Sequence, residues 1–154
     1  MFDLIYHPAP LYGLLTVAAL ALTALSGRHV LIKLALVLLF DWIAYNVIVD
    51  SNGFARAPLL IPTFDAAVGI WVGTQAWINH SRVGAIVFAL FTAVVAWWCA
   101  EIWAHAQASY LCYLMANLIF LSQVSLVGGA GGFAYVVDRR RSGHMRAHPH
   151  LARG

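Results

Sequence analysis

Charged side chains are scarce in this chain. Only 10% of its 154 residues are Asp, Glu, Lys or Arg, whereas 62% are hydrophobic. Soluble domains average about 25% charged and about 45–50% apolar residues, so this composition excludes an ordinary soluble fold. A membrane-spanning helix needs about 20 apolar residues, and four or five such helices would use nearly the whole chain. Little length remains for a soluble catalytic domain.

Cysteine, a signal peptide and enzyme motifs are also scarce or missing. The two cysteines, Cys99 and Cys112, lie in apolar segments, where a buried thiol is the expected role and a disulfide or a metal ligand is the lesser alternative. The first ten residues hold no Lys or Arg, which argues against a cleaved signal peptide. No Ser/His/Asp arrangement, Walker motif, Rossmann fingerprint or HExxH pattern supports an enzyme. We therefore predict a non-enzymatic protein with no cofactor.

Long apolar segments predict an all-α, polytopic transmembrane helix bundle. A turn signal, Asn52-Gly53, separates the second segment from the third. The last segment is longer than one bilayer crossing, so its glycine cluster at residues 128–132 is expected to bend it, unwind it or carry it into the membrane interface. The prediction is about five spans, with four as the alternative, within residues 1–137, at about residues 9–26, 29–50, 62–78, 83–105 and 109–132.

Positive charge is concentrated at the carboxyl end. Residues 138–154 hold five Arg and one acid, whereas residues 1–137 carry a formal net charge of −1. The positive-inside rule keeps this basic, flexible tail in the cytoplasm, and five crossings then place the amino terminus outside. We expect Arg139, Arg140 and Arg141 to anchor the topology and to contact anionic lipid headgroups. No specific nucleic acid is predicted as a partner.

One acid lies in the middle of an apolar span. Asp41 is near the centre of LIKLALVLLFDWIAYNVIVD, residues 31–50. An ionisable group at this depth costs at least about 2.5–3.5 kcal/mol to insert, and it normally faces a bundle interior, a partner or water. Two interpretations stay open: a structural hydrogen bond to a neighbouring helix, or a role in binding an ion, a proton or a ligand.

Further polar residues are expected at a similar depth. Counting 1.5 Å per residue from the span ends places them with Asp41 in the outer half of the membrane. They complete the set of candidates for binding an ion or a proton, because a buried carboxylate can exchange protons near neutral pH. The additional candidates are Tyr45, Glu101, His105 and Asn117.

Helical geometry divides the polar residues of the second span. At 100° per residue, Asp41 and Tyr45 share one face, while Asn46 and Asp50 lie nearly opposite and suit bonding to another helix, a subunit or headgroups. On the fourth span, Glu101 and His105 are four residues apart and share a face. A metal site built from Asp41, Glu101, His105 and Cys99 is a lesser alternative, so the metal remains unknown.

The third span has its own polar and small residues. Pro62 and Thr63 suit a helix start, which would place Asp65 in the first turn, near the positive end of the helix dipole. Gly69 and Gly73, in the sequence GIWVG, form a small-xxx-small pattern that favours close helix packing.

These features favour a membrane protein without catalytic machinery. In outline the chain resembles small bacterial membrane proteins and phage-encoded ones such as holins. We predict a multi-pass protein of the bacterial inner membrane, of bacterial or phage origin, which assembles with itself or with a membrane-protein partner. The alternative is a small ion channel or proton-coupled transporter, including a holin-like permeabilising protein. A metal-dependent membrane enzyme is less well supported.

Overall fold

The computed structural model describes residues 9–105 and 110–147, apart from the side chains of residues 9, 52–59, 105, 110 and 143–147. These residues form four helices, which are α2 (Ala9–Ser26), α3 (His29–Ile78), α4 (Arg82–His105) and α5 (Tyr110–Ala147). The predicted all-α class is confirmed. Three segments are long and apolar enough to cross a membrane, namely His29–Ser51, Arg82–Ala104 and Leu111–Ser142, and Pro10–Ser26 is a shorter apolar helix.

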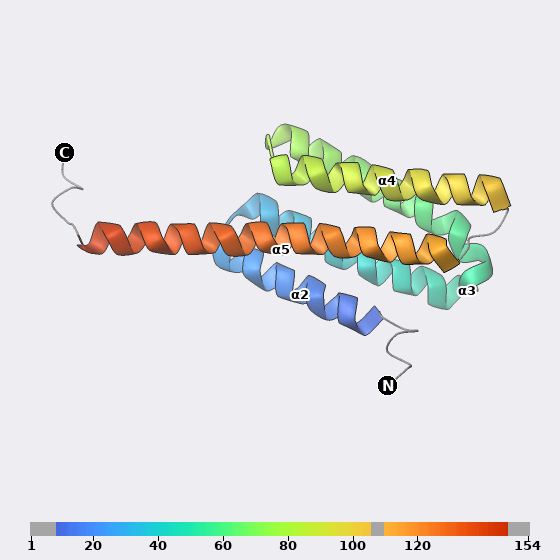
Figure 1. Ribbon diagram of the computed structural model, residues 1–154, viewed down its shortest axis with the longest axis horizontal. Helices are drawn as coiled ribbons and strands as arrows, with labels where there is room; N and C mark the ends of the chain where they lie inside the picture. Colours follow the sequence, from blue (N-terminus) through green and yellow to red (C-terminus); the bar gives the residue numbers. More distant parts are fainter. Residues whose placement is uncertain (1–8, 106–109, 148–154) are drawn as a thin grey trace.

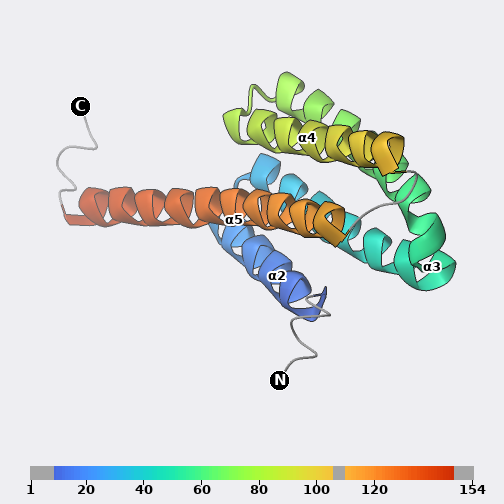
Figure 2. The ribbon, with the colours of Figure 1, turned by 45° about the vertical axis from the view of Figure 1, so that its right-hand side comes forward.

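Helix α3 contains both the second and the third predicted spans. The chain stays helical through residues 51–61, where the sequence predicted a turn. The rings of Phe40 and Phe64 nevertheless lie 5.8 Å apart, although 24 residues of straight helix would separate them by about 36 Å. The helix therefore folds back on itself, with a first limb before residues 51–61 and a second limb after them, as Figures 1 and 2 show beside the α3 label. Pro58, which lacks a backbone donor, lies in this bent part.

The helical segments alternate in direction. Gly13 of α2 packs against Trp42 in the first limb of α3, and Gly73 in its second limb packs against Phe88 of α4. Helix α5 then runs parallel to α2, because Tyr12 contacts Phe120 and further contacts follow in the same order along both helices. A left-handed glycine, Gly27 with φ 66°, ends α2 before the reversal into α3.

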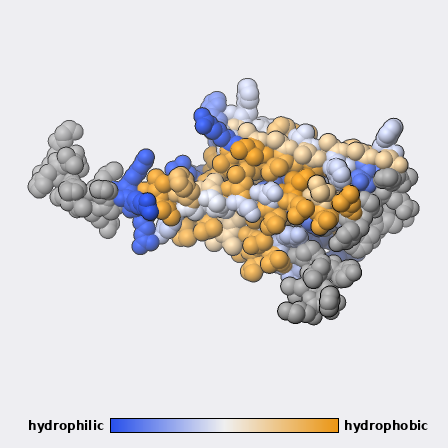
Figure 3. Space-filling model, viewed as in Figure 1, coloured by the Kyte–Doolittle hydropathy of each residue, from blue (hydrophilic) through white to orange (hydrophobic). Residues whose placement is uncertain are grey.

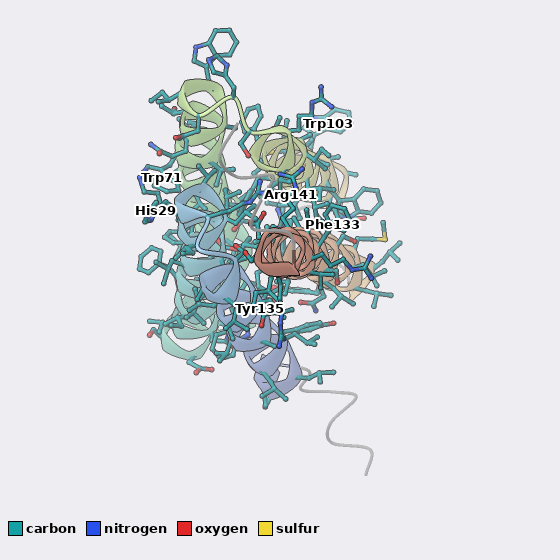
Figure 4. The ribbon with its side chains drawn as sticks, turned by 90° about the vertical axis from the view of Figure 1, so that its left-hand side faces the viewer. His29, Trp71, Trp103, Phe133, Tyr135 and Arg141 are labelled. Atoms are coloured by element: carbon teal, nitrogen blue, oxygen red, sulfur yellow. The ribbon has the colours of Figure 1, made fainter. Side chains whose placement is uncertain are left out.

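The exterior of the bundle is apolar. Large apolar side chains are widely exposed, with Trp103 at 90% and Phe133 at 73%. Figure 3 shows hydrophobic residues over most of one face, with hydrophilic residues gathered toward the end from which α5 projects. Seen from that end, Trp71 and Trp103 lie on opposite outer sides (Figure 4). An outer surface of this kind matches a lipid environment, where apolar side chains need no burial against protein.

Basic residues gather at one end of the bundle. Arg28, in the α2–α3 turn, lies 3.7 Å from the Asp138 carboxylate of α5. The exposed residues Arg139, Arg140 and Arg141 follow directly on α5, which extends beyond its neighbours there (Figure 1). Arg82 begins α4 after the α3–α4 turn, which lies toward the same end. Turn cations and tail cations therefore share one end of the molecule.

The glycine cluster of α5 neither unwinds nor sharply bends the helix, so the prediction of a bend or an unwound segment at residues 128–132 is wrong. Helix α5 continues through these residues without interruption and runs straight along its length (Figure 1). A Cβ on Gly128 would lie 3.0 Å from Ala19 Cβ, and one on Gly131 would lie 2.8 Å from Thr23 Cγ2. The glycines instead let α2 and α5 approach closely, as small residues do in membrane helix pairs.

Candidate functional site

Asp41 lies inside the bundle, on the first limb of α3. Its exposed fraction is only 7%, and it occupies the buried face of the limb between Leu38 and Tyr45. Asp41 Oδ1 is itself fully buried and has no hydrogen-bond partner among the described residues. A buried carboxylate oxygen without a partner is costly, so it needs a structural or functional explanation.

The fold-back of α3 brings a second acid to Asp41. Asp65 is 8% exposed on the second limb, and the adjacent Phe40–Phe64 ring contact fixes both acids at one depth. The two carboxylates are close enough to repel each other. The interpretation of Asp65 as a first-turn residue is wrong, because no helix begins at Pro62.

Gln123 is the third polar side chain at this depth. It is only 2% exposed and occupies the inward face of α5, four residues after Ile119 and four before Val127. Its Nε2 has no hydrogen-bond partner among the described residues. We call Asp41, Asp65 and Gln123 the polar layer.

Two apolar clusters enclose the polar layer. One contains Leu38, Val68 and Val127, and the other contains Trp98 and Cys112 together with residues packed against them. The other buried polar residues among those described, Thr16 and Thr23, donate to backbone carbonyls of their own helix. The polar layer therefore has apolar packing on both sides along the bundle axis.

The carboxylates of the polar layer have no buried cationic partner among the described residues. Every described Arg, Lys and His side chain is exposed. Moving an unpaired charge into a low-dielectric interior costs several kcal/mol even after relaxation. Two like charges side by side add mutual repulsion, and a bound proton or cation would lower this electrostatic cost.

The other sequence candidates are distributed over α3, α4 and α5. Tyr45 packs against the second apolar cluster and lies within electrostatic range of Asp65 and Tyr113. Half-buried Glu101 interacts with the region of Cys112 instead. Asn117 is half-buried on α5, and the His105 side chain lies outside the described residues.

Two polar residues of α3 lie outside the layer. Asn46 donates a hydrogen bond to the Trp42 carbonyl at 2.6 Å. Asp50 is exposed. Neither residue shares the buried environment of Asp41.

No metal centre is evident in the part of the chain that the structure describes. No three of its His, Cys, Asp and Glu residues are grouped to hold a metal ion. Cys99, proposed with Asp41 and Glu101 in the metal alternative, is exposed, whereas Cys112 is buried.

Gly69 and Gly73 bring the second limb of α3 against α4. A Cβ at Gly69 would lie 3.0 Å from Phe91 Cβ, and one at Gly73 would lie 2.8 Å from Phe88 Cδ2. This close packing holds the limb that carries Asp65.

Sequence reasoning missed Asp65 and Gln123 as site residues. Asp65 has apolar residues at helical spacing on one side, at positions 61, 68 and 72, which indicates an inward face. Gln123 follows Cys112, Ala116 and Ile119 on one face of an apolar helix. Comparison with protein-family models, curated proteins and solved structures finds no match for this chain.

Proposed function

We propose that this chain is a non-enzymatic, five-crossing membrane protein that takes up and releases a proton at the Asp41–Asp65 pair. The observation that carries the proposal is the burial of two neighbouring carboxylates without a buried cation from the described residues. One proton shared by such a pair removes one charge and the repulsion between the two. The proton then returns to water when a path opens to one side.

The basic end supports an orientation for this exchange. The alternating directions of α2, the two limbs of α3, α4 and α5 suit five crossings of a bilayer. With the basic end in the cytoplasm of a bacterial cell, the amino terminus is outside and the pair lies within the inner membrane.

Proton uptake by proteoliposomes tests the proposal. The purified full-length protein is reconstituted around a pH-sensitive dye, and proton entry is followed after a pH step. We expect uptake above that of empty liposomes, and Asp41→Asn or Asp65→Asn should reduce it to the empty-liposome level. Asp50→Asn is the matched control, because Asp50 is exposed on the same helix.

One combination of results would rule out the proposed proton exchange. Uptake by wild-type protein no faster than by empty liposomes, with no carboxylate of the pair titrating between pH 4 and 9, would rule it out. That range brackets the ordinary values of carboxyl groups, at about 4, and the raised values, up to about 9, of deeply buried ones.

Self-association is a second candidate function, favoured by the outer face of α4. Exposed small residues follow one side of this helix, and such stripes let membrane helices approach closely. The oligomeric state in mild detergent tests the candidate. Self-association would be supported if the wild-type protein is an oligomer, if Ala93→Phe dissociates it, and if Leu118→Phe, at an exposed position of α5, leaves it intact. A wild-type monomer would contradict this candidate function. The stripe consists of Ala85, Ala89, Ala93, Ala96 and Ala100.

A further inference from the structure

Two groups of the polar layer complement each other chemically. Gln123 Nε2 can only donate hydrogen bonds, and an ionised Asp41 Oδ1 can only accept them. Both atoms are buried without a partner among the described residues. Leaving either atom unbonded in an apolar interior incurs its full desolvation cost, so a bond between them relieves two penalties at once.

Helix contacts set Asp41 and Gln123 at nearly the same depth. Tyr12 of α2 stacks against Phe120 at 6.3 Å, and the next residue, Gly13, packs against Trp42. Asp41 precedes Trp42, and Gln123 follows Phe120 by three residues, or about 4.5 Å of helix rise. The buried faces of α3 and α5 carry these residues between the same two apolar clusters.

Three other buried donors belong to tryptophan rings that pack against other parts of the core. The indole nitrogens of Trp42, Trp97 and Trp98 also have no hydrogen-bond partner among the described side chains. Trp42, however, packs against α2. Trp98 stacks edge-on against Tyr113 at 5.1 Å, and Trp97 lies in the same apolar cluster. Gln123 is the fully buried amide among the described residues, and it belongs to the polar layer.

We propose that Gln123 is the positioning residue of the proton site and donates a hydrogen bond from Nε2 to the Asp41 carboxylate when the pair is deprotonated. This inference rests on the proposed function, because it assigns Gln123 to the same exchange. The proton leaves to water, and no other bond is broken. A hydrogen bond to the charged form favours that form. Gln123 therefore lowers the pH at which the pair releases its proton, and it ties α5 to α3 in that state.

The surrounding ionisable groups set the background of this titration. Asp65 lies within electrostatic range of Asp41. The other ionisable side chains around the polar layer come from all the helices packed against it. Among the described residues, none of these side chains is basic. They are Tyr45 on α3, Tyr12 on α2, Glu101 on α4, and Cys112 and Tyr113 on α5.

An infrared pH titration of the full-length protein tests the role of Gln123. The carbonyl band of protonated carboxyl groups is followed with pH, and the part that Asp41→Asn removes is assigned to the pair. Gln123→Met keeps the side-chain length and removes the donor. It should raise the midpoint by about one pH unit, which is a tenfold change in proton affinity. Ser122→Ala is the matched control, because Ser122 is exposed and its hydroxyl donates to the Leu118 carbonyl.

The outcomes separate this inference from the proposed function. A pair that titrates in wild type with the same midpoint in Gln123→Met overturns the role of Gln123 and leaves the proton site standing. A wild-type protein in which no band of the pair titrates overturns both. If Gln123→Met does not fold, nuclear magnetic resonance of nitrogen-15-labelled glutamine decides. The Gln123 amide signal should move over the pH range of the pair while that of Gln75 stays fixed, and an unmoved Gln123 signal overturns the inference.

Discussion

Gly131→Ala should destabilise the contact between α2 and α5 through a single methyl group. A Cβ at Gly131 would lie 2.8 Å from Thr23 Cγ2 and 2.9 Å from both Thr23 Cα and the Thr23 backbone nitrogen. Two of these three atoms belong to the α2 backbone, so rotation of the Thr23 side chain cannot relieve the clash. The two helices must move apart, and overpacking of this kind typically costs about 1–3 kcal/mol.

Gly129→Ala is the matched control for this perturbation. A Cβ at Gly129 meets nothing within 4 Å. Both substitutions gain the same preference of a helix for Ala over Gly, about 0.8–1 kcal/mol. When the free energies of unfolding of the two variants are compared, this gain cancels and the energetic cost of the clash remains. We therefore expect Gly131→Ala to be less stable than Gly129→Ala by about 1–3 kcal/mol.

Unfolding in mixed detergent micelles, followed by circular dichroism, measures the difference. Increasing the fraction of denaturing detergent should unfold Gly131→Ala first and Gly129→Ala last, with wild type between them or close to Gly131→Ala. Equal stability of the two variants would refute the close contact between α2 and α5. It would also reopen the interpretation of the glycine cluster as a flexible segment.

Three further predictions follow from the packing and exposure of particular residues. In Gly13→Ala the new Cβ would lie 2.6 Å from Trp42 Cη2, a clash that costs about 1–3 kcal/mol and is partly offset by the gain of about 0.8–1 kcal/mol for Ala over Gly in a helix. Gly13→Ala should therefore be less stable than Gly129→Ala in the same unfolding assay, and adding Trp42→Phe should reduce the difference. A membrane-permeant maleimide should alkylate exposed Cys99 in the folded protein and leave buried Cys112 unmodified, as intact mass shows with single-cysteine variants. A double-mutant cycle of Arg28→Ala and Asp138→Ala should give a coupling of at most about 1 kcal/mol, because both side chains are about half exposed.

The class of the fold follows from composition, whereas the path of the chain does not. Apolar segments of bilayer length can satisfy their backbone groups only as helices or closed barrels, which makes the all-α prediction robust. The sequence signals at Asn52-Gly53 and Pro58 correctly mark a reversal. They do not reveal whether the chain reverses through a loop or inside a bent helix, because tertiary packing decides between the two.

The partner of Asp41 illustrates the limit for the candidate site. Burial of Asp41 itself was expected from its place in an apolar span. Asp65 follows Pro62 and Thr63, so its local sequence matches a helix start as well as it matches a helix interior. Only the contact between the two limbs, seen at Phe40 and Phe64, brings the acids together. Local patterns carry no information about such a pairing.

The arrangement of the bundle keeps its two proposed functions on separate surfaces. All three members of the polar layer come from one chain and lie inward, so the proposed proton site needs no residue from a second copy. The alanines of the α4 stripe point outward, whereas Phe91 and Val94 of the same helix pack into the core. A helix-helix contact through the stripe therefore need not disturb the carboxylates. Proton release and self-association should respond independently to substitutions, because additivity is expected for sites without shared partners.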